Sequence, residues 1–166
     1  MRVYRQHRSR NAGVGKNLVG FLVGDIQYAV DIHRVREIIR PLPLVALPHA
    51  PAGIAGVADH RGEVVPIIEM RQRFALPPQT DGRRAKWILI LIGKRTVGLW
   101  VDSITGVLGA TQSDHRPAPE LGEGQASRGI SSVCAHASGL VFVLDVDRVA
   151  TLANVVQVPT LGTGSA

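Results

Sequence analysis

The stretch FLVGDIQYAVDIHRV, residues 21–35, recurs in outline as ILIGKRTVGLWVDSI, residues 90–104. Each copy has an apolar run, a turn led by glycine, a second apolar run and a short segment that begins with an aspartate. Short runs rich in Val and Ile that flank a glycine-led turn are typical of β-hairpins. The repeat therefore predicts two related hairpins, one in each half of the chain.

A second pair of segments extends the duplication. GEVVPIIEM, residues 62–70, resembles GLVFVLDV, residues 139–146. Both begin with glycine, continue through a β-rich run and end near a carboxylate. The simplest interpretation is two copies of one β-module, the first at about residues 18–80 and the second at about residues 84–153. A period this long is not that of a solenoid repeat.

Helices are expected to be few and short. Apolar residues with helical spacing predict one helical turn after the first hairpin, at Val35, Ile38 and Ile39. Asp102 and Asp145 precede apolar-periodic stretches, so each is a candidate N-cap. A terminal helix is predicted from Asp145 to Leu152.

The connections between strands are rich in proline and glycine. Four prolines predict a rigid extended connector over residues 40–52, namely Pro41, Pro43, Pro48 and Pro51. Residues 77–86 are interpreted as the link between modules, and residues 109–128 as a second long connector. Short strands hide their edges by curling into barrels. The prediction is an all-β fold of two small barrels about a pseudo-two-fold, with a groove between them for a ligand.

The positive charge is concentrated at one end. The chain has 166 residues and a net charge of +6, of which residues 1–17 supply +5. This basic leader is expected to be flexible, as is the tail at residues 154–166. The leader is interpreted as a solubilising tail or as an electrostatic tether to an anionic surface. A basic β-barrel that binds nucleic acid remains the alternative function, although seven aromatic residues (3 Phe, 2 Trp, 2 Tyr) offer few stacking platforms.

No pattern of residues predicts catalysis, a metal or a cofactor. The segment around Gly15 and Lys16 departs from the phosphate-binding loop, and the six histidines lack the spacing of metal ligands. Cys134 is the single cysteine, which fits a reducing compartment, and it is expected to be buried. The longest apolar run, residues 87–92, is far shorter than the ~20 residues of a membrane span.

Two surface features are candidates for protein contacts. Arg61 lies at a tight polar turn, where an arginine is either a solvated turn residue or an interface anchor. The segment Arg116-Pro117-Ala118-Pro119-Glu120-Leu121 holds two charges and a leucine in a stiff loop. Its prolines limit the entropy that is lost when such a loop binds a partner. A plain surface loop explains this second segment equally well.

With these residues in view, the chain resembles the CheW family of chemotaxis coupling proteins from about residue 21 to residue 152. The order and spacing of the matching stretches carry the resemblance, and no one stretch decides it. They are Gly24–Val35, Val35–Ile38, Pro51, Ile54–Val57, Arg61–Ile67, Val101–Ile104, Arg116–Glu120 and Leu144–Asp145. The resemblance implies two five-stranded SH3-like β-barrels related by a pseudo-two-fold.

The resemblance also implies a cytoplasmic adaptor without enzymatic activity. Such adaptors connect the cytoplasmic tip of methyl-accepting chemoreceptors to the regulatory domain of a CheA-type histidine kinase. Carried over by position, the receptor-binding residues are Val35, Glu37, Gly56, Arg61 and Val107. The kinase-binding residues are Arg116, Glu120 and Leu121.

This sequence departs from the family pattern at two places. Asp59-His60 stands where the family usually has Asn-Leu, directly before Arg61. Residues 126–129 are more polar than the usual aromatic-Ile-x-Gly. The segment at residues 48–53 is similar to couplers of surface-sensing and pilus pathways, so flagellar, pilus and surface-sensing outputs all stay open.

Overall fold

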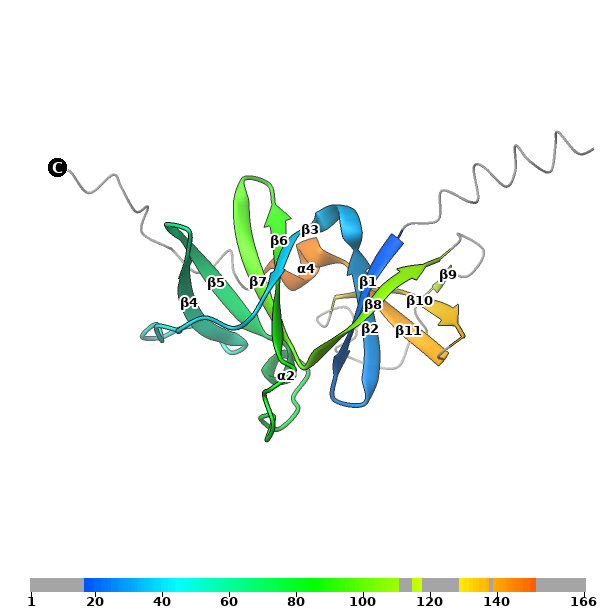
Figure 1. Ribbon diagram of the computed structural model, residues 1–166, viewed down its shortest axis with the longest axis horizontal. Helices are drawn as coiled ribbons and strands as arrows, with labels where there is room; N and C mark the ends of the chain where they lie inside the picture. The colour runs from blue at the N-terminus through cyan, green and yellow to red at the C-terminus, as the bar shows by residue number, and fades with distance from the viewer. Residues whose placement is uncertain (1–16, 111–114, 118–128, 138, 152–166) are drawn as a thin grey trace, which may run out of the picture.

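The computed structural model describes residues 17–110, 115–117, 129–137 and 139–151. It contains two mainly antiparallel sheets that lie side by side (Figure 1). One sheet has six strands in the order β8-β1-β2-β11-β10-β9. Their bounds are Ser103–Gly109, Asn17–Val23, Ile26–Asp31, Gly139–Leu144, Ile130–His136 and His115–Pro117. The other has five strands in the order β3-β6-β7-β5-β4. Their bounds are Val35–Ile39, Lys86–Ile92, Arg95–Val101, Glu63–Glu69 and Ile54–His60.

The two sheets repeat one topology, which confirms the all-β prediction and the duplication. Each contains a central hairpin, β1-β2 or β6-β7, and each hairpin pairs in parallel with the last strand of the other half, β2 with β11 and β7 with β5. After its hairpin, each half continues in the other sheet, so that β3, β4 and β5 lie with β6-β7, and β8 to β11 lie with β1-β2. β3 follows β2 in the chain but pairs with β6, and β8 follows β7 but pairs with β1. Each sheet is therefore built from both halves of the sequence.

The core is continuous across both sheets. Phe21 and Tyr28 stack with ring centroids 6.0 Å apart, and Tyr28 stacks on Phe74 at 4.7 Å. These rings belong to a cluster that also takes in buried side chains of the five-stranded sheet, such as Ile88 and Leu99. Smaller clusters fill the rest of each sheet, and Cys134 lies in one of them at 2% exposure, as expected. Burial of this shared core holds the two sheets together.

The helical turn after the first hairpin lies earlier than the sequence predicted. Ile32–Arg34 forms a 3-10 turn, η1, which the side chain of Asp31 caps by accepting the N–H of His33. Val35 to Ile39 are strand β3, so the prediction of a helix there is wrong. The segment is rich in β-branched residues, and its backbone groups pair with β6 instead of with one another.

The other helices are also single turns. α2 spans Met70–Arg73 and α4 spans Val146–Val149. The predicted N-cap at Asp145 is confirmed, because its side chain accepts the N–H groups of Asp147 and Arg148. The N-cap prediction for Asp102 is wrong, since strand β8 follows it and its carboxylate serves a tertiary contact.

Candidate docking site

Strand β3 brings Glu37 to the tip of the β4–β5 hairpin. β3 and β4 are the two edge strands of the five-stranded sheet, and residues 61–62 form the turn after β4. A carboxylate oxygen of Glu37, Oε2, lies 3.0 Å from Nε2 of His60. The other, Oε1, accepts a hydrogen bond of 3.1 Å from the guanidinium of Arg61. This Glu37–His60–Arg61 cluster ties one edge of the sheet to the other.

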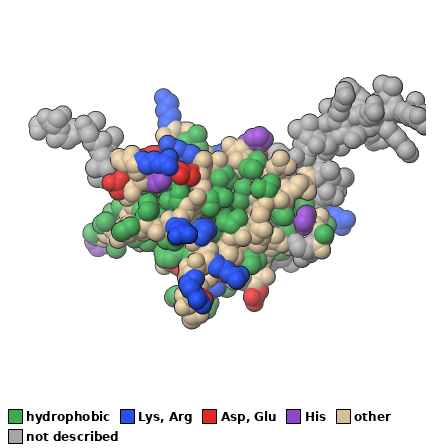
Figure 2. Space-filling model, viewed as in Figure 1, with side chains coloured by type: hydrophobic (Ala, Val, Ile, Leu, Met, Phe, Trp, Pro, Cys, Tyr) green, Lys and Arg blue, Asp and Glu red, His purple; other side chains and the backbone are tan. Residues whose placement is uncertain are grey.

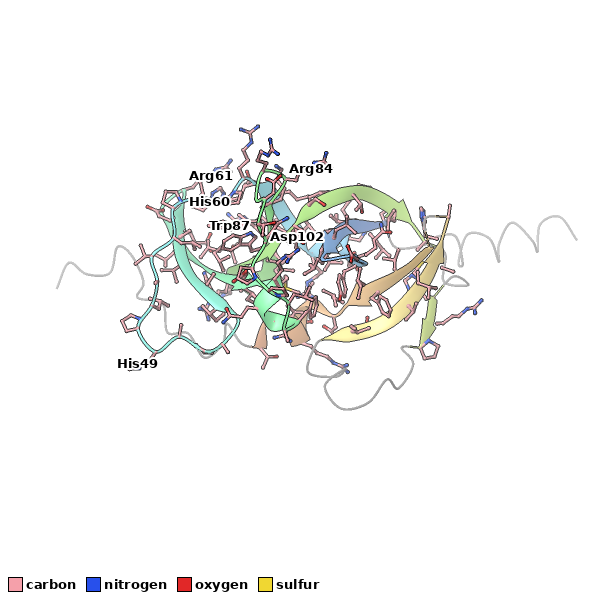
Figure 3. All side chains as sticks on the ribbon, turned by 90° about the horizontal axis from the view of Figure 1, so that it is seen from below. His49, His60, Arg61, Arg84, Trp87 and Asp102 are labelled. Carbon is pink, nitrogen blue, oxygen red and sulfur yellow. The ribbon has the colours of Figure 1, made fainter. Side chains whose placement is uncertain are left out.

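The local sequence explains why Arg61 projects from the hairpin. Arg61 and Gly62 have φ values of 53° and 81°, the left-handed pair that a two-residue hairpin turn of type I′ requires. The side chain of Asp59 accepts the N–H of Gly62 at 2.9 Å and holds the turn closed. The side chain of Arg61 is consequently 74% exposed, whereas that of His60 is 14% exposed. Figure 3 shows both residues at the same edge of the molecule.

A second ion pair borders the cluster. Arg36, next to Glu37 on β3, donates to the carboxylate of Glu63 at 2.9 Å and to the hydroxyl of Thr96 at 2.6 Å. Glu63 is the strand partner of His60 across the hairpin. Figure 2 shows basic, acidic and histidine side chains gathered at one edge of this face. Charged groups of both signs alternate there, a pattern that favours a rim able to fix the register of a partner.

Gly56 packs against the connector instead of lying on an open contact surface. It is buried, with φ of 151°, and an added Cβ would lie 2.4 Å from the carbonyl oxygen of Val45. Val45 belongs to the connector at residues 40–52 and makes two backbone hydrogen bonds with Val57 on β4. The proline-rich connector thus runs beside β4 in close contact with Gly56, and the missing side chain makes room for it.

The remaining residues of the proposed receptor face lie on both sheets. Val35 is half-buried at the start of β3, and Val107 is 62% exposed on β8. β3 and β8 are the strands with which each half of the chain enters the other sheet, and Figure 1 shows them crossing the junction of the sheets. Ile38, also on β3, is 39% exposed. Apolar side chains run across the middle of the same face in Figure 2.

The second proposed face is described only in part. Arg116 is exposed on β9, a three-residue edge strand that pairs with β10. The sequence pattern had suggested a loop at this position. Glu120 and Leu121 lie outside the described residues.

A cavity of about 620 Å³ lies where the chain crosses from one sheet to the other, and Arg71, Asp102, Arg83 and Arg84 are among its lining residues. Arg71 donates to both oxygens of Asp102, and this hydrogen bond raises the pKa of Arg71. Asp81, another lining residue, pairs with Arg83 at 3.0 Å. The predicted groove between the modules therefore has a counterpart here, but none of the proposed docking residues lines it.

Sequence reasoning missed the residues that hold these surfaces in place. His60 was noted only as a departure from the family pattern, and nothing local signalled its contact with Glu37. The pairing of Arg34 with Asp147, at 2.6 Å, spans both halves of the chain and also escaped notice. That contact lowers the pKa of the Asp147 carboxyl, chiefly through the hydrogen bond from Arg34. Long-range pairs of this kind leave no trace in spacing.

The described segments contain neither a metal-binding cluster nor a helix that could span a membrane. Residues 17–110, 115–117, 129–137 and 139–151 contain no group of three or more His, Cys, Asp or Glu side chains that could hold a metal. Over the same segments, no helix has the length and apolarity needed to cross a membrane.

Comparison with known proteins agrees with this architecture. The family model of the CheW-like domain matches residues 17–154. A probable chemotaxis protein CheW from Rhizobium etli is 36% identical over 129 residues, 76% of this chain and 83% of that protein. The chemotaxis protein CheW of Rhizobium meliloti is 31% identical over 135 residues, 81% of this chain and 87% of that protein.

A solved structure supports the fold in the same way. The scaffolding protein TtCheW from Thermoanaerobacter tengcongensis matches with a TM-score of 0.73 at 21% identity. The match covers 79% of this chain and 89% of that one. The sheets, the family match and the relatives agree: this chain belongs to the CheW-like domain family.

Proposed function

We propose that this protein is a non-enzymatic adaptor that couples methyl-accepting chemoreceptors to a CheA-type histidine kinase in a chemotaxis-like pathway. A signalling scaffold of the chemotaxis type is what its family and its relatives' names support. The finer assignment of partners rests on the surface around the Glu37–His60–Arg61 cluster. The pathway's output, whether flagellar, pilus-based or surface-sensing, is left open by this proposal.

One observation carries the proposal above all: Arg61 is held outward on a rigid turn beside β3, where it contacts Glu37. A guanidinium on a rigid turn binds carboxylates and carbonyls in a fixed geometry at small entropic cost. Val107 offers an exposed apolar contact on β8. A helical hairpin that lays apolar side chains on such a face, with charges at its rim, suits this arrangement.

The kinase is proposed to bind elsewhere on the molecule. Arg116 projects from the edge strand β9 of the six-stranded sheet, and Glu120 and Leu121 complete the proposed contact. An adaptor with two separate faces can occupy a receptor and a kinase at once. Repeated weak contacts of this kind build an array through multivalency. The protein is expected in the cytoplasm, and at the membrane only through its receptors.

The test is co-sedimentation with receptors. Purified chain is mixed with membranes that contain a methyl-accepting receptor from the same genome, and the pelleted fraction is measured for wild type and for Arg61→Ala. Loss of the Arg61 contact should weaken binding about tenfold or more, the effect of losing ~1.4 kcal/mol at an interface.

Arg83→Ala is the matched control. Arg83 is also an exposed turn-region arginine paired with a carboxylate, Asp81, but it belongs to the segment between the modules. Its replacement should leave co-sedimentation unchanged. Wild-type recruitment by Arg61→Ala would remove the assigned face, and failure of the wild type to pellet with any receptor would remove the proposed function.

A further inference from the structure

The carboxylate of Glu37 is shared between two neighbours. Its Oε2 lies 3.0 Å from Nε2 of His60, and its Oε1 accepts from Arg61 at 3.1 Å. The side chain of Glu37 is 30% exposed, and that of His60 is 14% exposed. The carboxylate of Glu37 therefore lies between a largely buried partner, His60, and an exposed partner, Arg61. Each oxygen of Glu37 has one partner within the described part of the chain.

This arrangement fixes what the site offers to a partner. A guanidinium has five N–H donors, and one nitrogen of Arg61 contacts Glu37. The side chain of Arg61 is 74% exposed, so its other donors are accessible to a partner. The negative charge of Glu37, in contrast, is turned inward toward the ring of His60. Seen from outside, the surface presents hydrogen-bond donors and positive charge more than it presents a carboxylate.

We propose that His60 is a positioning residue that holds Glu37 inward and so makes the site select a partner segment with an acidic side chain opposite Arg61. This inference rests on the proposed function, because it concerns the same face and the same receptor. His60 does not touch the partner in this scheme. It acts through Glu37, because it engages the carboxylate oxygen Oε2 and leaves only Oε1 to pair with Arg61.

Protonation of His60 should make the affinity for an acidic partner depend on pH. In imidazolium, and in one neutral tautomer, Nε2 carries a hydrogen and donates to Glu37, so protonation need not break the contact. It changes the net charge of the Glu37–His60–Arg61 cluster from zero to +1.

The charged groups around the cluster are already engaged. Asp59 holds the turn by accepting from Gly62, and Arg36 on β3 balances Glu63 on β5. An added positive charge on His60 is therefore not cancelled by a free neighbouring carboxylate among these groups. It should strengthen attraction to an acidic partner.

The experiment measures affinity at two pH values. The full chain is titrated by calorimetry with a soluble fragment of the receptor's cytoplasmic signalling tip, at about pH 6 and about pH 8, a range over which histidine side chains can gain or lose a proton. Wild type should bind about threefold to tenfold more tightly at the lower pH, a change of about one charge at close range. Removing an acidic side chain of the fragment by Glu→Gln substitution should abolish this difference.

Three variants separate the contributions. His60→Leu removes both the donor and the titrating ring. It should weaken binding about fivefold at the higher pH, because both oxygens of Glu37 can then pair with Arg61, and by about threefold to tenfold more at the lower pH, where only the wild type gains a charge. His60→Gln keeps an N–H donor without titrating, so it should match the wild type at the higher pH and show no pH dependence. His49→Gln is the control, since Figure 3 shows His49 far from His60, and it should keep the wild-type slope.

Each failure has its own meaning. If wild type binds the fragment and His60→Leu binds it as tightly as wild type does at each pH, His60 is not a positioning residue and the proposed function stands. If His60→Gln keeps the wild-type slope, the titrating group lies elsewhere and the inference is overturned. If wild type does not bind the fragment, the proposed function itself fails. Unfolding of each variant in urea checks that all are folded, and His60→Gln carries the test if His60→Leu is not.

Discussion

Arg71 and Asp102 form a multidentate ion pair at the junction of the two sheets. Nε of Arg71 donates to both carboxylate oxygens at 2.9 and 3.0 Å, and a terminal nitrogen donates at 2.8 Å. The same carboxylate accepts the N–H of Gly24 at 2.8 Å. Arg71 also donates to the carbonyl of Pro77 at 2.7 Å. One pair thus links the turn β1–β2, the helical turn α2 and the passage from β7 to β8.

Replacing Arg71 by methionine should destabilise the whole domain. The side chains of Arg71 and Asp102 are 19% and 11% exposed, so the carboxylate would be left largely buried without its cation. Removing one member of such a pair costs about 3 kcal/mol. Urea unfolding followed by tryptophan fluorescence measures the free energy of unfolding.

Arg83→Met provides the comparison for that prediction. Arg83 makes the same kind of pair with Asp81, but its side chain is 89% exposed. Exposed pairs contribute little to stability, so this variant should unfold at the wild-type urea concentration. Equal stability of Arg71→Met and Arg83→Met would show that the junction pair does not hold the sheets together.

Gly56→Ala should destabilise the protein through a clash with the connector. The new Cβ would lie 2.4 Å from the carbonyl oxygen of Val45, and φ at this position is 151°. Gly106 separates the two effects, because its φ is 136° and an added Cβ has nothing within 4 Å. Gly106→Ala should cost about 1–2 kcal/mol from backbone strain alone, and Gly56→Ala about 2 kcal/mol more.

The comparison of these two alanine variants also bears on the receptor face. Equal losses of unfolding free energy would mean that the connector moves away easily from a side chain at position 56. A larger loss for Gly56→Ala means that weaker receptor binding by that variant reflects the fold as well as the contact. Arg61 and Val107 are for this reason the cleaner positions for testing the face.

Asp147→Asn should lower stability at neutral pH and have no effect in strong acid. The hydrogen bond from Arg34 lowers the pKa of Asp147 below its ordinary value of 3.8. A carboxyl whose pKa is lowered by folding stabilises the fold at pH values above the unfolded pKa. That contribution disappears as the pH falls through the folded-state pKa.

The size of this effect is limited by solvent, because the side chain of Asp147 is 62% exposed. The loss at pH 7 should be about 0.5 kcal/mol. Urea unfolding of wild type and variant at neutral pH and well below pH 3.8 tests the sign. A difference that persists unchanged in acid would contradict the assignment of the effect to the carboxylate charge.

Sequence reasoning recovered the hairpins and missed the exchange of strands. The turns at Gly24 and Gly93 and the runs around them were readable because a hairpin is a local structure. The partners of β3 and β8 are set by packing between distant segments, which spacing does not encode. The five residues from Val35 to Ile39 fit a helical turn and a strand equally well, and only the pairing with β6 decided between them.

At the candidate site, too, local features could be predicted from the sequence and long-range contacts could not. Arg61 was recognisable from its turn, because the dipeptide Arg61-Gly62 follows a strand and precedes another. Its partner Glu37 lies 24 positions away and was reached only by resemblance. The contact of Glu37 with His60 spans 23 positions and carries no sequence signal. Asp102 was predicted to be an N-cap, which is wrong, because its actual partners Gly24 and Arg71 are distant in the sequence.

Val107→Asp should weaken receptor binding without affecting the fold. Val107 is 62% exposed on the edge strand β8, so a charge there is solvated in the free protein and stability should change by no more than about 0.5 kcal/mol. In a complex, the same charge would be desolvated against an apolar partner surface, and affinity should fall about tenfold or more. Leu140→Asp is the matched control, because Leu140 is also 62% exposed but lies on β11. Titration of both variants with the receptor fragment should therefore give a weakened complex for Val107→Asp and a wild-type complex for Leu140→Asp. Equal weakening by both would mean that binding responds to surface charge in general, and the assignment of β8 to the receptor face would have to be withdrawn.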